Sequence, residues 1–306
     1  MTDEAVRKFR EAYDSSLEAK RLIDISIALE GMPRHTQVHA AGVVITDKPV
    51  FDYVPLAVSH ESTVTQYDMD KIYDIGLVKF DFLALRYLTI ISDAERLIRK
   101  REPDFDIEKI SLDDEKTYKF ISEGNTEGLF QLESAGMKRL LTNLCPKNIE
   151  DITAAISLYR PGPMDSIPEY LKNRKNPENI HYSIPALKPI LDVTCGCVIY
   201  QEQVMSIFRE VAGYSLGKAD IVRRMMAKKK TAEMERERAV FIEGAKKRGT
   251  NAGDANQLFD RLFAFASYAF NKSHAAAYAL ISYRTAYLKC KYPKEYMAAL
   301  LTNALF

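Results

Sequence analysis

Apolar positions in residues 3–30 recur every three or four places, and this period is typical of amphipathic α-helices. The pattern predicts two helices that end at the Gly-Met-Pro of residues 31–33. Short β-rich runs separated by Asp, Pro and Ser turns follow. The expected strands cover residues 41–45, 54–56, 64–66 and 76–82. We therefore expect one small sheet after the two helices.

After residue 83 the apolar period changes to 3.6, and helical segments dominate to residue 306. In the first of these segments Leu88, Ile91, Ala94 and Leu97 share one helix face. The chain is predicted to be an α+β protein, in which a small sheet-containing part precedes a larger, mostly helical part.

The composition is that of a soluble globular protein. With 306 residues, 47% of them hydrophobic, the chain can bury a substantial core in one large or two modest domains. It holds no apolar run of about 20 residues, the length of a membrane span, and residues 1–10 lack a signal core. A cytoplasmic location is expected.

Four cysteines are too few for a disulfide framework. Cys195 and Cys197 are close in sequence, but a zinc site needs two further ligands, and His181 is the only histidine nearby. We interpret the two cysteines as buried structural thiols.

Charge is distributed unevenly along the chain. Residues 1–110 contain 15 Lys and Arg against 20 Asp and Glu, whereas residues 195–306 contain 18 against 10. The second half therefore has the charge to bind a polyanion, although solvated basic helices would give the same count.

Asp81 is the first candidate for chemistry. Strand alternation places Lys79 and Asp81 on one face and Phe80 and Phe82 on the other, so that a cation and a carboxylate meet above a packed sheet. The pair is either a metal-binding carboxylate with a neighbouring cation or a structural ion pair. A nucleotidyl-transfer site holds two divalent ions with several carboxylates, which one Asp cannot provide.

Two basic segments are further candidates. In residues 217–230, Val222 and Met226, like Ile221 and Met225, are expected to face the core, while the basic side chains face outward as a phosphate-binding or merely solvated stripe. In residues 158–164 two prolines around a glycine stiffen a turn and fix the direction of Arg160.

Residues 271–274, Asn-Lys-Ser-His, precede an Ala-rich helix that carries three tyrosines. Free N–H groups at a helix start would favour an anion or nucleotide site. Alternatively Asn271 or Ser273 is an N-cap and the tyrosines belong to the core.

Read in order, these segments resemble the bacterial replicative DNA polymerase III alpha subunit, the C family of DNA polymerases. The matching motifs are HAAGVVI at 39–45, GLVKFDFLALR at 76–86, GLFQLES at 128–134, RPGP at 160–163, YQEQVM at 200–205, RRMMAKKK at 223–230 and FNKSHAAAY at 270–278.

The resemblance implies a small mixed sheet from a palm similar to β-type nucleotidyltransferases, followed by helical fingers. It assigns residues 1–36 to a thumb remnant, 37–86 to the C-terminal palm and 87–306 to the fingers. In the family three aspartates hold two Mg²⁺ ions, and Asp81 corresponds to the third. The first two are expected upstream of residue 1. Asp104 and Asp106 resemble that pair but fall on its wrong side, and we interpret them as part of a solvated loop. Ala84, where the family commonly has glycine, is expected to perturb packing slightly.

The resemblance also implies site residues. Asp81 is the catalytic metal ligand, and Lys79 lies near the triphosphate or primer terminus. The implied nucleotide- and DNA-binding residues are His39, Arg160, Arg223, Arg224, Lys228, Lys229, Lys272 and His274.

The implied function is part of a DNA-directed DNA polymerase that adds deoxynucleotides to a primer 3′ end in bacterial chromosome replication. Its substrates would be primer-template DNA and deoxynucleoside triphosphates, and a sliding clamp and a proofreading exonuclease would bind through regions outside this chain. Because the start at Met1 leaves Asp81 without its partners, the fragment alone is expected to be inactive. Alternatives are a non-catalytic DNA- and nucleotide-binding remnant, half of a split polymerase completed in trans, or a helical scaffold unrelated to nucleic acid.

Overall fold

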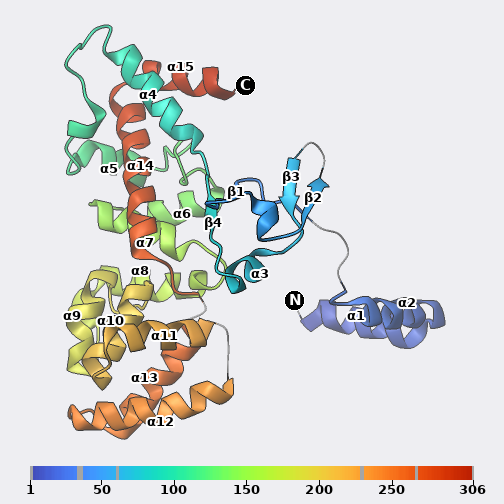
Figure 1. Ribbon diagram of the computed structural model, residues 1–306. Coiled ribbons are helices and arrows are strands. Elements are labelled where there is room, and N and C mark those ends of the chain that lie inside the picture. Colours follow the sequence, from blue (N-terminus) through green and yellow to red (C-terminus); the bar gives the residue numbers. More distant parts are fainter. Residues whose placement is uncertain (1–2, 33–36, 60–61, 228–230, 266–267, 305–306) are drawn as a thin grey trace. The chain divides into compact units, whose positions relative to one another are not determined.

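The computed structural model describes residues 3–32, 37–59, 62–227, 231–265 and 268–304 (Figure 1). The chain divides into two compact units, Met1–Ala84 and Leu85–Phe306. The first contains the strands and the second is mostly helical, which confirms the α+β fold class. Within the described residues no helix is both long and apolar enough to cross a membrane.

The first unit begins with the two predicted helices, α1 (Asp3–Ser15) and α2 (Leu17–Leu29). Ser16 separates them, and its Oγ accepts a hydrogen bond of 3.2 Å from the N–H of Ala19, which caps α2. The hydroxyl of Tyr13 donates to Asp24 over 2.8 Å and ties the two helices together.

All four expected strands are present, with shifted bounds. They are β1 (Gly42–Val44), β2 (Leu56–Ser59), β3 (Ser62–Thr65) and β4 (Lys79–Asp81), with η1 (Val50–Asp52) and α3 (Met69–Asp74) between them. Instead of one mixed sheet they form two antiparallel pairs, β1–β4 and β2–β3. Phe80 and Phe82 are 44% and 66% exposed, so the packed sheet expected beneath Asp81 is wrong for the described residues. A two-stranded pair without a second layer leaves its apolar face uncovered.

The second unit is built from helices of 4 to 20 residues. These are α4 (Arg86–Ile98), α5 (Glu115–Ser122), α6 (Ala135–Leu144), α7 (Ile149–Leu158), α8 (Ile167–Lys175), α9 (Lys188–Leu191), α10 (Gln201–Ala212), α11 (Leu216–Ala227), α12 (Thr231–Lys247), α13 (Ala252–Phe265), α14 (Lys272–Lys291) and α15 (Pro293–Ala304). Short 3₁₀ helices connect them: η2 (Ile107–Lys109), η3 (Pro163–Ser166), η4 (Pro177–Asn179), η5 (Pro185–Leu187) and η6 (Asp192–Thr194).

Two hydrophobic cores organise this unit. The first joins α4 to α8 with α14 and α15 and contains the fully buried Tyr283 and Tyr296. Within it α7 lies along α14 (Figure 1). The second core joins α9 to α13 around the edge-to-face rings of Phe208 and Phe241, whose centroids are 5.0 Å apart.

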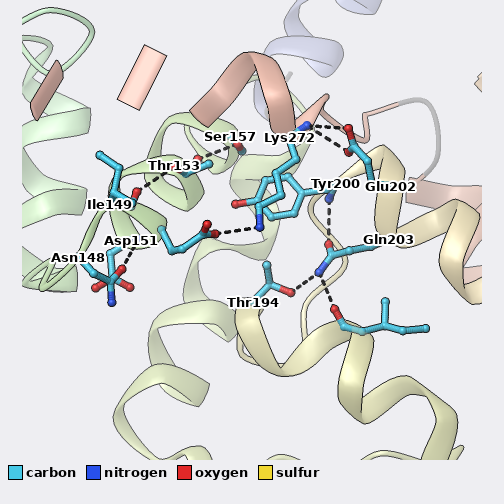
Figure 2. Close-up of polar contacts among 12 residues, drawn as sticks. Asn148, Ile149, Asp151, Thr153, Ser157, Thr194, Tyr200, Glu202, Gln203 and Lys272 are labelled. Carbon is cyan, nitrogen blue, oxygen red and sulfur yellow. Dashed lines mark hydrogen bonds and ion pairs between the residues drawn. The ribbon is translucent and has the colours of Figure 1, made fainter. Parts of the chain in front are cut away.

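A buried polar network holds the chain where it passes between the two cores (Figure 2). The side-chain oxygen of Gln203 accepts hydrogen bonds from the N–H groups of Ile199 and Tyr200 at 2.9 and 3.0 Å. Its amide nitrogen donates to Thr194 Oγ1 at 2.7 Å and to the Ile190 carbonyl at 3.1 Å. All four polar contacts of this buried amide are therefore made within the chain.

Some helix faces differ from the predicted ones. In α11 Val222 and Met226 are buried as expected, but Ile221 is 60% exposed. In α4 the core side chains include Ile90 and Ile98, whereas Leu88 is half exposed. Periodicity locates a face only to within a neighbouring residue, and packing decides which side chains it covers.

The expectation for the cysteines is confirmed. Cys195 and Cys197 are both buried, and burial raises the pKa of the Cys197 thiol to about 12. Asp104 is exposed, and Asp106 caps η2 through the N–H of Glu108 at 2.9 Å, as suits a loop rather than a catalytic strand.

Candidate functional site

The pairing of β1 with β4 determines where Asp81 lies. Gly42 stands opposite Asp81, and Val44 stands opposite Lys79. The ammonium group of Lys79 donates to Asp81 Oδ1 over 2.7 Å, and the Lys79 side chain is mostly buried while that of Asp81 is 43% exposed. This hydrogen bond lowers the pKa of the Asp81 carboxyl below its ordinary value, so the group is a carboxylate at neutral pH.

His39 lies beside this pair. Its Nδ1 is 3.6 Å from Asp81 Oδ1 and accepts a hydrogen bond of 3.2 Å from the N–H of Ala41, which orients the ring. A Cβ at Gly42 would lie 3.1 Å from both His39 Nδ1 and the Lys79 side chain. The absence of a side chain at Gly42 therefore lets the three polar groups meet.

The residues present do not complete a divalent metal site. In the part of the chain that the structure describes, no three His, Cys, Asp or Glu side chains are grouped so as to hold a metal ion. Asp81 offers one carboxylate, and one of its oxygens already accepts from Lys79. Two Mg²⁺ ions need several oxygen ligands, so Asp81 alone does not fit them.

The second unit holds another group of predicted residues at the start of α14, of which Figure 2 labels Lys272. Asn271 is the N-cap, and its side-chain oxygen accepts from the N–H of His274 at 2.8 Å. The N–H of Lys272 contacts both carboxylate oxygens of Glu202, at 3.1 and 3.2 Å. The interpretation of Asn271 as the N-cap is thus confirmed. The expectation of free N–H groups is wrong for Lys272 and His274, because both groups already donate within the chain. Of the three tyrosines, Tyr283 is fully buried.

The Lys272 side chain reaches back to α7. Its Nζ lies 3.0 Å from a carboxylate oxygen of Glu150 and 5.5 Å from the centre of the Tyr200 ring. A cleft of about 510 Å³ opens beside Lys272, with Tyr200, Glu202 and Arg209 in its lining. The Lys272 ammonium group is therefore paired with a carboxylate of the chain at the edge of this cleft.

The side chains of Arg160 and His274 both lie against the Phe270 ring, and Tyr278 lies against His274; we call Phe270, His274 and Tyr278 the aromatic column. The guanidinium of Arg160 lies 3.7 Å from the centre of the Phe270 ring, and burial lowers its pKa from the ordinary value. The His274 ring is 5.5 Å from Phe270 and 4.2 Å from Tyr278. Phe270 is itself held by backbone hydrogen bonds with Ile199 and Gln201 at 3.0 and 2.9 Å.

Gly162 determines the shape of the turn that follows Arg160. Gly162 has φ +101°, a conformation that side chains other than glycine rarely adopt. A Cβ there would lie 2.1 Å from the Tyr268 ring. The turn after Arg160 therefore requires glycine for two independent reasons.

The other predicted basic residues are placed differently. Arg223 and Arg224 on α11 both contact the carboxylate of Asp220, and Arg223 does so at 2.8 Å. The Arg223 side chain is mostly buried, and that of Arg224 is 70% exposed. Within the described part of the chain, neither arginine forms a hydrogen bond or ion pair with Arg160 or Lys272. Lys228 and Lys229 lie outside the described residues.

Sequence reasoning missed the acidic and aromatic members of the site. Glu150 carries no local signal, because its partner Lys272 is distant in sequence. Phe270 and Tyr278 both lie within the FNKSHAAAY segment and could have been found there, as polar residues followed by aromatic ones at helical spacing. A guanidinium that lies on an aromatic face keeps its N–H edge available to donate hydrogen bonds to an anion.

Comparison with known proteins identifies the family. Residues 87–249 match the bacterial DNA polymerase III alpha subunit finger domain, and residues 2–84 match the bacterial DNA polymerase III alpha NTPase domain. The chain belongs to the bacterial DNA polymerase III alpha subunit family.

The similarity to individual proteins of this family agrees with the assignment. The DNA polymerase III subunit alpha of Thermus aquaticus is 48% identical over 98% of this chain and 25% of its own length. The protein of that name from Borreliella burgdorferi is 47% identical over 97% of this chain and 26% of its own length. The one from Bacillus subtilis is 43% identical over 100% of this chain and 28% of its own length. The chain thus spans about a quarter of the length of these relatives.

Proposed function

We propose that this chain is the thumb end, C-terminal palm and fingers of a DNA-directed DNA polymerase that adds deoxynucleotides to a primer 3′ end in bacterial chromosome replication. In this proposal residues 1–36 belong to the thumb, 37–86 to the palm and 87–306 to the fingers. The observation that carries it is the meeting of Arg160 and His274 on Phe270, next to Lys272.

These residues suit a nucleoside triphosphate and primer-template DNA. A guanidinium contacts phosphate oxygens in pairs, and an ammonium supplies a point charge. The aromatic rings of the column keep Arg160 oriented without neutralising it. For Lys272 to contact a phosphate, the ligand has to replace the carboxylate of Glu150.

In the palm, we assign Asp81 as one protein ligand of the Mg²⁺ ions that such a polymerase uses, two in the complete site. Lys79 and His39 would lie near the triphosphate or primer terminus. The remaining carboxylates would come from polypeptide outside these 306 residues. Arg223, Arg224, Lys228 and Lys229 would contact the DNA backbone.

A second candidate is a DNA- and nucleotide-binding part without catalysis of its own, either a remnant or half of a split polymerase. The contacts of Asp81 support it, because one oxygen of this carboxylate already accepts a hydrogen bond from Lys79. In both candidates the site would act in the bacterial cytoplasm, and a sliding clamp and a proofreading exonuclease would bind elsewhere on the complete subunit.

DNA binding tests what the two candidates share. The affinity of the chain for a fluorescent primer-template duplex, measured by anisotropy, is expected to fall steeply as salt rises. Arg160→Ala should weaken binding and reduce the slope of log K against log salt by about one. Arg96→Ala on the exposed face of α4 is the control and should leave both unchanged. Binding that is indifferent to salt would contradict the proposal.

Primer extension separates a catalytic part of a polymerase, split or continuous, from a non-catalytic remnant. With Mg²⁺ and deoxynucleotides the chain alone is expected to extend no primer. A polypeptide that supplies the two missing aspartates should restore extension if the chain is half of a split enzyme, and should have no effect on a remnant. Extension by the chain alone would overturn the argument that three carboxylates are required.

A further inference from the structure

The loop of residues 128–134, Gly-Leu-Phe-Gln-Leu-Glu-Ser, has no role in the function proposed above. Within it Gln131 has φ +63°, in the left-handed region that glycine and, less often, asparagine adopt. A residue with a long side chain keeps this backbone conformation only where the surrounding structure imposes it.

The neighbouring residues impose it from both sides. Phe130 is buried; its N–H donates to Thr285 Oγ1 at 3.3 Å, and its carbonyl accepts from Ser282 Oγ at 2.9 Å. Leu132 is fully buried in the first core. Both hydroxyls belong to α14, so the helix that carries the functional group also holds this loop.

No internal contact explains why glutamine stands at this position. The side chain of Gln131 is exposed, and its carboxamide makes no hydrogen bond with the other described residues. The other non-glycine residues with left-handed backbone have structural explanations. Cys145 ends α6, where its N–H donates to the Leu141 carbonyl, and Cys195 is buried and its carbonyl accepts from Asn173.

The loop and the helix that follows it adjoin the candidate site. The Phe130 ring lies 5.1 Å from Tyr278, which stacks on His274. In α6, directly after the loop, a Cβ at Gly136 would lie 1.8 Å from the hydroxyl of Tyr159, the residue before Arg160. Gln131 therefore lies next to Phe130, which packs against the His274 side of the site, and a few residues before a helix that packs against Tyr159.

We propose that Gln131 contacts the primer-template duplex through its carboxamide, at a groove edge of the bases rather than at a phosphate. This inference rests on the proposed function. A carboxamide is neutral and both donates and accepts hydrogen bonds. The minor groove offers acceptors at every base pair, so such a contact positions a duplex of any sequence.

The test uses the intact chain with Gln131→Gly and Gln131→Asn. Both replacements tolerate a left-handed backbone, so the thermal midpoint should stay the same or rise. The affinity for a labelled primer-template duplex should fall about 3- to 10-fold for Gln131→Gly, as expected for the loss of one or two hydrogen bonds, and less for Gln131→Asn, which keeps a carboxamide on a shorter side chain. The slope of log K against log salt should not change, because no phosphate contact is lost.

Cys145→Gly is the matched control, since it relaxes a residue with φ +49° on the next helix and should leave DNA affinity unchanged. Equal affinity of Gln131→Gly and wild type, or an equal loss in Cys145→Gly, would overturn the inference and leave the proposed function standing. A wild-type chain that does not bind the duplex would refute the proposed function and the inference with it.

Discussion

The carboxylate of Glu150 lies 3.0 Å from the Nζ of Lys272, so the cation at the start of α14 is already paired within the chain. The pair joins two helices that pack along each other in the first core. A phosphate that binds Lys272 has to compete with a carboxylate held in place by α7. Affinity for an anion is therefore a difference between two interactions of similar chemistry.

Removing the internal competitor should tighten triphosphate binding. We expect Glu150→Gln to raise the affinity for a deoxynucleoside triphosphate about 3- to 10-fold in calorimetric titration, because Lys272 is then free to contact phosphate. Glu243→Gln, which removes an exposed carboxylate on α12 near Lys247, is the control and should have no effect. Equal affinities for the Glu150 variant and the wild type would show that this pair does not limit binding.

Asp81 should titrate below its ordinary pKa of 3.8, because Lys79 donates a hydrogen bond to the carboxylate. A pKa that is lower in the folded chain means that this contact stabilises the fold above about pH 4 and is lost as the pH falls through the folded pKa. Carboxyl NMR shifts should place the Asp81 midpoint below 3.8, and Lys79→Ala should raise it. A midpoint that does not respond to Lys79→Ala would contradict this assignment.

Gly162→Ala should destabilise the chain for two reasons, backbone strain and the clash with Tyr268. Gly249→Ala is a matched control, because its φ is +84° and nothing lies within 4 Å of the added Cβ. By chemical denaturation we expect a loss of about 1 kcal/mol for the control and roughly 2 to 4 kcal/mol for Gly162→Ala. Duplex affinity should fall only in Gly162→Ala, since the turn orients Arg160. Equal losses of stability would mean that Tyr268 moves aside.

Gln203→Ala should remove the amide that holds the chain between the two cores. The N–H groups of Ile199 and Tyr200 would lose their acceptor in a buried setting, at a cost of about 1 to 3 kcal/mol each. Gln257→Ala on the exposed side of α13 should change the unfolding free energy by less than about 0.5 kcal/mol. A loss below about 1 kcal/mol for Gln203→Ala would indicate that water replaces the amide.

Local pattern predicted the elements better than their partners. The spacing of apolar residues located α1, α2 and the four strands, because helix and strand periods are properties of neighbouring residues. It did not predict that the strands form two separate pairs, nor that Ile221 faces solvent. Those outcomes depend on which surfaces are available to cover an apolar face.

Motifs in a fixed order were enough to recognise the family and to select Asp81, Arg160 and Lys272 as candidate residues. The pairing of Glu150 with Lys272 and the stacking of Arg160 on Phe270 became visible only in the folded chain. The difference comes from the range of the interactions. Periodicity, caps and turns are set within a few residues, whereas an ion pair or a stacked ring depends on packing between helices that the pattern of either one does not encode.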